Sequence, residues 1–372
     1  NGVGDFYYTP PLGIDSGTSN HFALCTANLP EPTVVPSKHF NTVLYTGTGN
    51  TNNPQNVGFQ PDFTWIKQRS DGDWNALQDS IRGNTKILGS NDESYGEFDI
   101  DDALTGFTST GFTLGADTDG FVNESNKTYV AWNWKAGGNA AAVGSNTDGS
   151  INTTDTTVNA AAGFSISTYT GTGSAATVGH GLSKKPEMII IRRRDDAAGW
   201  RVFHDFSTAS YHYVLNTTAA RASSSSIFNN TNPTTSVFTV GAGGSVNASS
   251  GTFVAWCFHS VAGYSAVGSY TGNGNADGAF VYTGFRPAYI LIKCSSGAAD
   301  WVIQDTKRSP INPREVVLLA NSAAAEADWS AYDIDILSNG FKMRTSAQGT
   351  NAALNYIYYA VAETPFKYSN AR

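Results

Sequence analysis

Four aromatic residues are the strongest candidates for ligand contact in this chain of 372 residues. Trp329 and Tyr332 stand close together in a stretch rich in Ala, Ser and Asp, and Tyr211 and Tyr213 alternate along a predicted strand. Tyr and Trp combine an apolar ring face with a polar tip, which suits the face of a sugar. These residues therefore predict a carbohydrate-binding surface, with ordinary packing as the alternative.

Metal chemistry finds little support in the sequence. Asp117-Thr-Asp-Gly120 begins like a calcium-binding loop, but position twelve of such a loop must be Glu and is Thr128 here. We expect this segment, like the acidic stretch Asp99–Asp102, to be a solvated turn. None of the histidines stands at a recognisable metal-ligand spacing: His21, His39, His180, His204, His212 and His259. No metal or other cofactor is predicted.

Catalytic motifs are also missing from the sequence. It contains no Gly-x-Ser-x-Gly nucleophile turn, no phosphate-binding Walker loop and no repeated Cys–His pair. A glycan-cleaving enzyme would need two carboxylates about 5–9.5 Å apart, and no such pair can be identified. Cys25, Cys257 and Cys294 show no disulfide or zinc spacing, so we expect buried free thiols. The sequence therefore favours a protein that is not an enzyme.

The elements that must position the aromatic residues come from a threefold internal repeat. Its copies begin at Tyr45-Thr-Gly-Thr-Gly, Tyr169-Thr-Gly-Thr-Gly and Tyr270-Thr-Gly-Asn-Gly. Each continues through a second turn with Gly and Pro into an apolar strand that ends in a cation, namely Lys67, Arg192 or Lys293. Repeats at this spacing indicate tandem structural modules. The Gly…Pro turns are expected to be structural.

Further landmarks keep the same register. Trp74, Trp200 and Trp301 follow the repeat Tyr by 29, 31 and 31 residues, and each precedes an Asp. Phe112, Phe238 and Phe341 follow it by 67, 69 and 71 residues, ahead of a last aromatic strand. A residue that recurs in every copy is more simply a determinant of the fold than a catalyst. We expect the repeated Asp to cap a turn through backbone amides.

Composition points to an all-β protein outside the cytosol. Charged residues make up only 15% and aromatic residues 12%, and the strand-like runs are short and bounded by Gly, Asn, Asp and Ser. We predict three tandem antiparallel β-sandwich modules, jelly-roll-like in form. The net charge of −8 argues against nucleic acid as a partner, and no apolar run is long enough to insert into a membrane.

The repeat also predicts the boundaries of the modules. Residues 1–38 would be the end of an upstream β domain with a Pro-rich linker, which implies a longer protein. Module 1 is predicted at 39–138, a polar linker at 139–162, module 2 at 163–261 and module 3 at 262–372. Because the linker is long, we expect modules 1 and 2 to hinge. Modules 2 and 3 join directly and should be rigidly docked.

Taken together, the motifs resemble a known family. Asn41–Lys67, Ala176–Leu182 and Gly268–Ala288 are similar to a repeat domain of uncharacterised function in virion proteins of tailed bacteriophages, many of them marine or cyanobacterial. These proteins are tail-fibre-like, and the resemblance covers residues 39–367. Asp5–Pro11 and Ala23–Pro30 resemble the closing part of a concanavalin-like (SPRY-type) sandwich. The resemblance implies a structural or adhesive role in the virion, outside the cell.

The function expected is presentation of repeated β modules for contact with glycans of the host surface. A decoration (cement) protein of capsid or tail, or an appendage, with a purely structural role is the alternative. The expected partners are other virion proteins and further copies of this chain, as a homotrimer by analogy with phage fibres. A binding site should lie where the modules differ, namely Asn91–Asp102, Ala219–Thr235 and Ser322–Asp335, and module 3 is the preferred location.

Overall fold

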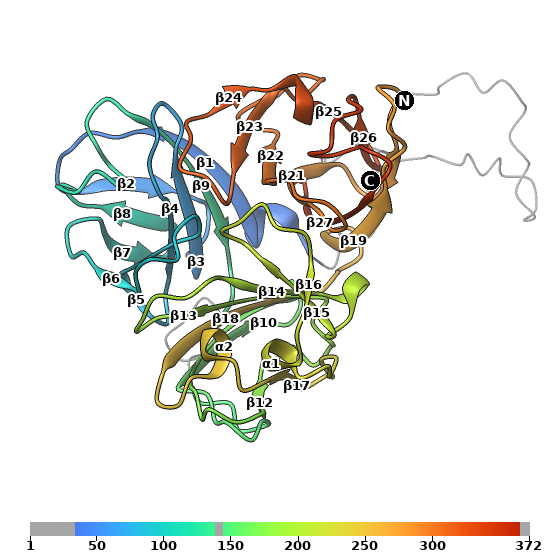
Figure 1. Cartoon of the computed structure of the whole chain (residues 1–372). Helices are drawn as coiled ribbons and strands as arrows, with labels where there is room; N and C mark the ends of the chain where they lie inside the picture. The colour runs from blue at the N-terminus through green and yellow to red at the C-terminus, as the bar shows by residue number, and fades with distance from the viewer. Residues whose placement is uncertain (1–33, 138–143, 365–372) are drawn as a thin grey trace, which may run out of the picture.

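The computed structural model describes residues 34–137 and 144–364, and within them nearly all regular structure is β-strand (Figure 1). Three large antiparallel sheets each face a smaller antiparallel sheet. This arrangement confirms the predicted all-β, antiparallel class. The two α-helices of the described residues, α1 (Ser225–Phe228) and α2 (Gly244–Asn247), are single turns in module 2.

Module 1 has a large sheet in the order β1-β9-β3-β4-β5-β6 and a small sheet in the order β2-β8-β7. A 3-10 turn, η2 (Pro36–Lys38), leads into it. Its strands are β1 (Phe40–Thr46), β2 (Asn53–Asn56), β3 (Phe63–Gln68), β4 (Asn75–Asp79), β5 (Gly83–Gly89), β6 (Phe98–Asp99), β7 (Leu104–Thr108), β8 (Gly111–Leu114) and β9 (Thr128–Trp134).

Module 2 repeats this order with one extra strand at the edge, β10-β11-β18-β13-β14-β15-β16, opposite a pair β12-β17. A 3-10 turn, η4 (Asp205–Ser207), follows β14. The strands are β10 (Asp155–Asn159), β11 (Phe164–Thr170), β12 (Ala176–Gly179), β13 (Met188–Arg193), β14 (Arg201–His204), β15 (Tyr211–Val214), β16 (Ala222–Ser223), β17 (Val237–Val240) and β18 (Thr252–Phe258).

Module 3 has the large sheet β19-β27-β21-β22-β23-β24 and the small sheet β20-β26-β25. The 3-10 turn η5 (Ser330–Tyr332) lies between β24 and β25. The strands are β19 (Ser265–Thr271), β20 (Phe280–Tyr282), β21 (Pro287–Cys294), β22 (Trp301–Asp305), β23 (Val316–Leu319), β24 (Ala327–Asp328), β25 (Ile334–Leu337), β26 (Gly340–Met343) and β27 (Asn355–Ala362).

The repeat prediction is confirmed by the position of its tyrosines. Tyr45, Tyr169 and Tyr270 are each the last residue but one of the equivalent strands β1, β11 and β19. Each ring stacks on the aromatic residue directly opposite in the last strand of the module, with centroids 5.1, 5.1 and 5.0 Å apart. Each hydroxyl donates to a backbone carbonyl at 2.6–2.7 Å. The three modules therefore share one fold.

The Gly…Pro turns show why glycine recurs there. Gly58, Gly181 and Gly284 have φ angles of 92°, 71° and 84°. Side chains of L-residues rarely adopt this left-handed backbone region, whereas glycine enters it at little cost. The turn thereby reverses the chain before the apolar strands β3, β13 and β21. This is the structural role that the sequence predicted.

Each large sheet is buried on both faces. Along β13, Ile189 and Ile191 enter the core between the two sheets of module 2, whereas Met188 and Ile190 face the other way. That second face contributes to a central core that all three modules share. In an antiparallel sheet with one solvent-exposed face, apolar and polar residues alternate along each strand. In a sheet that is covered on both faces, they do not. The unbroken apolar run of β13 is therefore explained by the neighbouring modules.

The three modules surround this central core like sectors of a ring (Figure 1). Aromatic rings meet there across module boundaries: Phe63 and Trp256 lie 5.3 Å apart, Trp134 and Tyr289 5.4 Å, and Phe258 and Tyr359 4.9 Å between centroids. Modules 1 and 2 are thus packed as closely as modules 2 and 3. The expected hinge between modules 1 and 2 is wrong, because a shared apolar core fixes their relative position.

The predicted linker 139–162 also needs correction. Residues 155–159 form β10, which pairs along its whole length with β11 and widens the large sheet of module 2. Thr156, Thr157 and Val158 are β-branched residues of the kind that favours strands, and Thr157 is buried. The polar composition of this segment concealed a strand. Most of the predicted upstream segment, including Cys25 and His21, lies outside the described residues.

Candidate functional site

The loop between β23 and β25 carries the preferred candidate residues. Trp329 caps the short turn η5 and Tyr332 is its last residue. Their rings lie 5.8 Å apart at an interplanar angle of 48°, and both side chains are half-buried. The sequence therefore identified two residues that lie together in space, and both rings pack against the core of module 3 while remaining partly exposed.

These rings line a surface pocket of about 480 Å³. Its lining comprises Asp300, Leu319, Asp328, Trp329, Ser330, Ala331 and Tyr332. The Tyr332 hydroxyl donates to Asp300 Oδ2 at 2.8 Å, and Asn321 Nδ2 donates to Oδ1 of the same carboxylate at 2.8 Å. Burial and this contact with Asp300 raise the pKa of Tyr332. The pocket thus combines two aromatic faces with carboxylate and hydroxyl groups that can hydrogen-bond a sugar.

A carboxyl group beside the pocket titrates near neutrality. Asp333 follows Tyr332, and its Oδ1 is buried without a hydrogen bond. Burial, followed by the negative charges of Glu315, Asp328 and Asp335, raises its pKa to about 6. Removing a carboxylate from water disfavours its charged form. The Asp333 carboxyl group therefore stays mostly ionised at pH 7 and gains its proton as the pH falls through about 6.

Two contacts with distant segments of module 3 fix the position of Tyr332. Gln304 Nε2, on β22, donates to the Tyr332 carbonyl at 2.6 Å. The Tyr332 ring lies so close to Gly349 that a Cβ there would be 2.1 Å from a ring carbon. Any larger residue at position 349 would displace the ring. Neither contact could be predicted from the sequence, because each joins segments that are distant along the chain.

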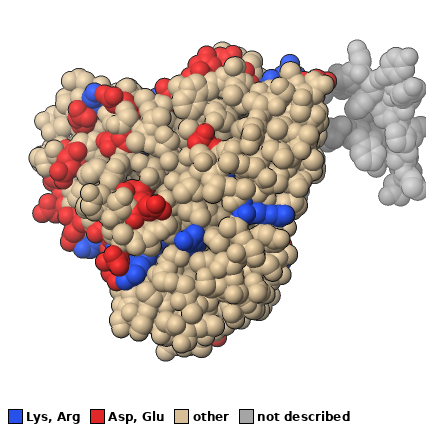
Figure 2. All heavy atoms as spheres, in the orientation of Figure 1, with Lys and Arg blue, Asp and Glu red and all other residues tan. Residues whose placement is uncertain are grey.

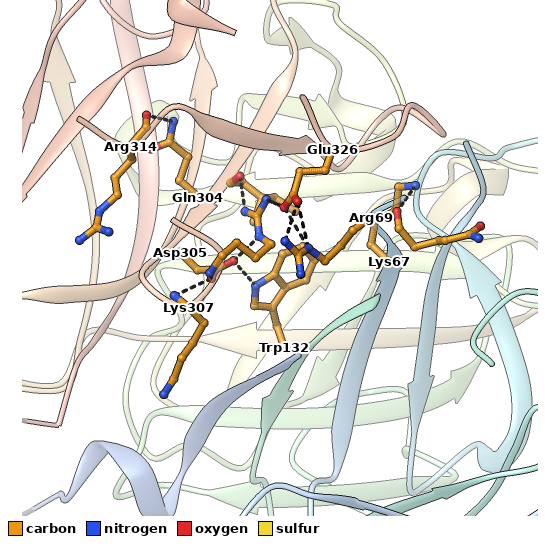
Figure 3. Close-up of polar contacts among 11 residues, drawn as sticks. Lys67, Arg69, Trp132, Gln304, Asp305, Lys307, Arg314 and Glu326 are labelled. Carbon is orange, nitrogen blue, oxygen red and sulfur yellow. Dashed lines mark hydrogen bonds and ion pairs between the residues drawn. The ribbon is translucent and has the colours of Figure 1, made fainter. Parts of the chain in front are cut away.

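Module 1 holds the other end of the loop. Glu326 receives hydrogen bonds from Arg69 of module 1, at 2.7 Å for the shortest, and from Arg308 of its own module at 3.0 Å. The Glu326 amide donates to the Arg69 carbonyl at 2.9 Å. The buried Lys67 ammonium donates to the Ala323 carbonyl at 3.0 Å. Figure 3 shows these side chains converging between the two modules.

The same network anchors an indole of the central core. Asp305 Oδ2 accepts from Trp132 Nε1 at 3.0 Å, and the Arg308 guanidinium lies 5.5 Å from the centre of the Trp132 rings (Figure 3). The Asp305 carboxylate also accepts from the backbone amides of Lys307 and Arg308. The predicted role of this repeated Asp as a turn cap is confirmed here, and it gains a second role in joining modules.

The interface between modules 1 and 2 repeats this clamp. Arg82, held by Asp79 at 2.6 Å, lies 5.5 Å from the Trp256 ring centre. Glu97 binds both Arg82 and Arg194 of module 2, at 2.7 and 2.9 Å. Burial opposes the charge of Glu97, but the two guanidinium groups hold its pKa below the usual value. The clamp of module 1 on module 2 therefore matches that of module 3 on module 1.

The third interface is built differently. Thr208 stands where the other modules have Arg82 and Arg308, and Ser295 stands where they have Arg194 and Arg69. The Tyr213 hydroxyl bridges Ser207 and Ser295, and Arg221 Nη1 donates to the Ser207 hydroxyl at 3.2 Å. The equivalent backbone bond remains, from the Arg221 amide to the Ser295 carbonyl at 3.1 Å. The ring is therefore closed by two ionic clamps and by a third interface in which hydroxyl and carbonyl groups replace the ion pairs.

The other predicted ligand contacts, Tyr211 and Tyr213, lie in β15 of module 2 and are not brought to the pocket. Tyr213 is fully buried against Trp301 at the interface with module 3, so its prediction as a binding residue is wrong. It packs there because strand alternation turns it inward. Tyr211 is half-buried, and the Arg221 guanidinium covers one ring face at 4.5 Å.

The remaining candidates behave as structural residues. Asp117 is buried and accepts the Val122 and Asn123 amides, so the expected solvated turn is wrong at this residue. Burial lowers the pKa of His180 and His204 to about 4, which leaves both neutral. Cys257 and Cys294 are buried free thiols, as predicted. Across residues 34–137 and 144–364, no cluster of three His, Cys, Asp or Glu side chains could hold a metal ion.

The charged side chains are unevenly distributed over the surface of the molecule. In Figure 2 the acidic side chains gather over module 1 and near the pocket loop of module 3, while the visible face of module 2 is nearly uncharged. Within the described part of the chain, no helix is long and apolar enough to cross a membrane.

Three buried asparagines have a structural role that was not predicted from the sequence. Asn123, Asn247 and Asn351 each accept a hydrogen bond from the Gly-rich turn, through the amides of Thr48, Thr172 and Asn273 respectively. They follow the repeat Tyr by 78, 78 and 81 residues. Their recurrence at nearly the same spacing in each copy is the signal that could have revealed them.

Comparison with known proteins adds one finding. No curated protein matches this sequence. The model of a domain family of unknown function, DUF7483, matches residues 35–365. The match runs without interruption through all three modules, which agrees with their common core. Because it covers most of the 372 residues, this chain belongs to the DUF7483 family.

Proposed function

We propose that this protein is a bacteriophage virion protein of the tail-fibre or surface-fibre type, and that module 3 contacts glycans of the host surface. Support for the virion role comes from the resemblance of the repeat motifs to tail-fibre-like proteins. A rigid, turn-rich β scaffold that carries variable loops is a suitable way to present a recognition site. The proposal includes an extracellular location and no enzymatic activity.

The pocket at Trp329 and Tyr332 is the observation that carries the glycan proposal. The corresponding loops of the other modules pack apolar residues against their own modules, although Tyr95 of module 1 remains 56% exposed. In module 1, Tyr95 and Phe98 pack against Trp74 at 6.3 and 5.2 Å between centroids. In module 2, Ile227 and Phe228 are buried in the sandwich core. Among these three loops, the one in module 3 pairs two rings over a pocket with hydrogen-bonding groups.

Adsorption of the assembled particle to host cells tests the proposal. Replacing Trp329 and Tyr332 together by Ala should reduce adsorption, because both stacking faces are removed. Tyr95→Ala is the matched control, since it removes an aromatic side chain, 56% exposed, from the corresponding loop of module 1. Adsorption at the normal rate with both pocket residues replaced would contradict glycan contact at this site. It would favour the alternative role as a decoration (cement) protein.

A further inference from the structure

Two exposed aromatic residues of module 3 lie outside the pocket. Phe280 and Tyr282 are 46% and 67% exposed and occupy alternate positions of the edge strand β20, whereas Val281 between them is buried. Side chains at alternate positions point to the same side of a strand and are about 7 Å apart. Both rings therefore project from the outer face of the small sheet, away from the sandwich core.

Residues of the neighbouring strands β26 and β25 border these two rings on the outer face of the small sheet. Phe280 is paired with Lys342, and Lys342 with Asp335; Tyr282 is paired with Gly340, and Gly340 with Leu337. Gly340 has no side chain and leaves a gap beside Tyr282. A Cβ at Gly340 would lie 3.1 Å from a ring carbon of Phe280, so that ring leans over the glycine. We call the outer face formed by Phe280, Tyr282 and Gly340 the aromatic platform.

The charges around the aromatic platform neutralise one another. Lys342 pairs with Asp277 at 2.6 Å, Arg344 with Asp335 at 3.3 Å and Arg286 with Glu363 at 2.6 Å. Among the residues that the structure describes, these three pairs balance the charges beside the rings. A charged polymer gains little from such a surface, while an uncharged ligand with apolar and hydroxyl faces loses little by approaching it.

The other modules have no equivalent of these rings. At the same register beside the repeat Phe, module 1 has Pro54 and Asn56 and module 2 has Thr177 and Gly179. The fold therefore does not require aromatic residues here. Exposed aromatic side chains that the fold does not need are candidates for recognition. The pocket loop also leads directly into β25 of the same small sheet after Asp333.

From these observations we infer that the aromatic platform is a second saccharide-binding surface, which takes uncharged sugar units. It extends the proposed glycan contact to a face that the pocket residues do not form. The aromatic rings would stack on the apolar faces of sugar rings, and the ion pairs at its margin would accept and donate hydrogen bonds to hydroxyl groups.

Native electrophoresis of the full chain in gels that contain dextran, mannan, β-glucan or alginate tests this inference. At least one of the three neutral polysaccharides should retard the protein. Phe280→Ala with Tyr282→Ala should weaken that retardation about tenfold, as expected for the loss of aromatic contacts. Tyr282→Phe keeps the ring and should largely retain binding. Ile311→Ala, at a residue of module 3 that is 77% exposed, is the control and should change nothing.

The outcomes separate this inference from the proposed function. If the double platform variant is retarded like the unmodified protein while Trp329→Ala with Tyr332→Ala is not, the platform inference fails and the pocket proposal stands. If no neutral polysaccharide retards the protein, the platform inference fails, and adsorption to host cells remains the test of the pocket proposal. If the platform variant instead changes the mass seen by light scattering, the platform joins copies of the chain and the saccharide inference is wrong.

Discussion

At the scale of single residues, the repeated asparagines anchor the Gly-rich turns of all three modules. Asn247 is fully buried, accepts the Thr172 amide at 2.8 Å, and donates to the carbonyls of Gly241 and Ser174 at 2.9 and 2.6 Å. One side chain thus satisfies three backbone groups that would otherwise be buried without partners. Unsatisfied buried groups of this kind are costly.

We therefore predict that Asn247→Ala lowers the free energy of unfolding by about 2–4 kcal/mol, because it leaves several backbone groups unpaired. Denaturant unfolding followed by circular dichroism measures the loss. Asn152→Ala, at an exposed position just before β10, is the control and should be nearly neutral. Equal stability of the two variants would show that water replaces the missing hydrogen bonds.

The buried lysines make stability depend on pH. Burial lowers the pKa of Lys67 and of Lys293 to about 8, against 10.5 for an exposed lysine. Between pH 8 and 10.5 the unfolded chain keeps these protons while the folded chain has released them. The unfolded state then binds more protons, so a rise in pH favours the folded state. Below pH 8 the penalty of burying both charges is fully present.

We expect the melting temperature to rise from pH 8 to about pH 10, with the two lysines contributing on the order of 2–3 kcal/mol each. Above pH 10 the trend should reverse, because burial raises the pKa of Tyr169 and Tyr264 and they ionise first in the unfolded chain. Calorimetry at several pH values measures the slope. Lys67→Met should flatten it, and a melting temperature that falls steadily over this range would contradict the prediction.

At the scale of elements, each interface clamp holds one variable loop. The Glu97 amide bonds to the Arg194 carbonyl at 2.6 Å, as the Glu326 amide does to that of Arg69 at 2.9 Å. The first pair ties down the loop at 91–102 and the second the loop at 322–335. Arg194 and Arg69 are both 22% exposed, so the two clamps form a matched pair.

Removing either arginine should release its own loop and leave the other in place. For Arg69→Met we expect faster amide hydrogen exchange in residues 322–335, and for Arg194→Met in residues 91–102. Each variant should lose about 1–3 kcal/mol of stability, because a partly buried carboxylate is left with one partner fewer. Each variant is the control for the other. Equal exchange of both loops in both variants would mean that the clamps act only through global stability.

The elements also show how much of the fold and of the candidate site could be predicted from the sequence. The tyrosines, tryptophans and turn glycines predicted three homologous β modules because each copy needs the same internal contacts. The partners of the pocket residues could not be predicted, since Gln304 and Gly349 contact Tyr332 from distant segments. Tyr213 was misjudged because strand alternation does not say which face a neighbouring module covers. The Asp-x-x-Arg motif at Asp79 and Asp305 was visible in the sequence, but its partner indoles were not.

At the scale of the whole molecule, stability is shared between modules. Tyr289, Leu291 and Tyr359 of module 3 are buried in the central core against residues of modules 1 and 2. An isolated module would expose that face to water, and an apolar patch of this kind promotes association. The absence of disulfides between Cys257 and Cys294 is thereby offset by packing within one chain.

We predict that a fragment of residues 263–364 does not form a stable monomer, because the central face of its large sheet is uncovered. Gel filtration and near-ultraviolet circular dichroism should show aggregation or loss of fixed packing, with residues 34–364 as the folded control. A monomeric fragment with cooperative thermal unfolding would show that the core between the two sheets of the module suffices.

The predicted homotrimer of the intact chain stays a prediction that does not follow from the packing of the modules. The prediction rests on analogy with phage fibres, and stability does not by itself require a trimer, because three modules of one chain already share a core. Light scattering at micromolar concentration distinguishes a mass of 39.5 kDa from three times that value. A stable monomer would contradict the trimer and leave the modular ring as the functional unit.

The unequal interfaces of the ring have a consequence for valency. A symmetric trimer of identical modules would carry three equal sites, and a mutation in one would appear in all. Because the modules are fused into one chain, each copy can change independently. Two interfaces therefore keep their ionic clamps while the third, among the described residues, has none. Among the three variable loops, only that of module 3 carries the aromatic pocket. If the proposed virion role holds, strong attachment to a host would require many chains on one particle to act together, because this pocket occurs in one module of each chain.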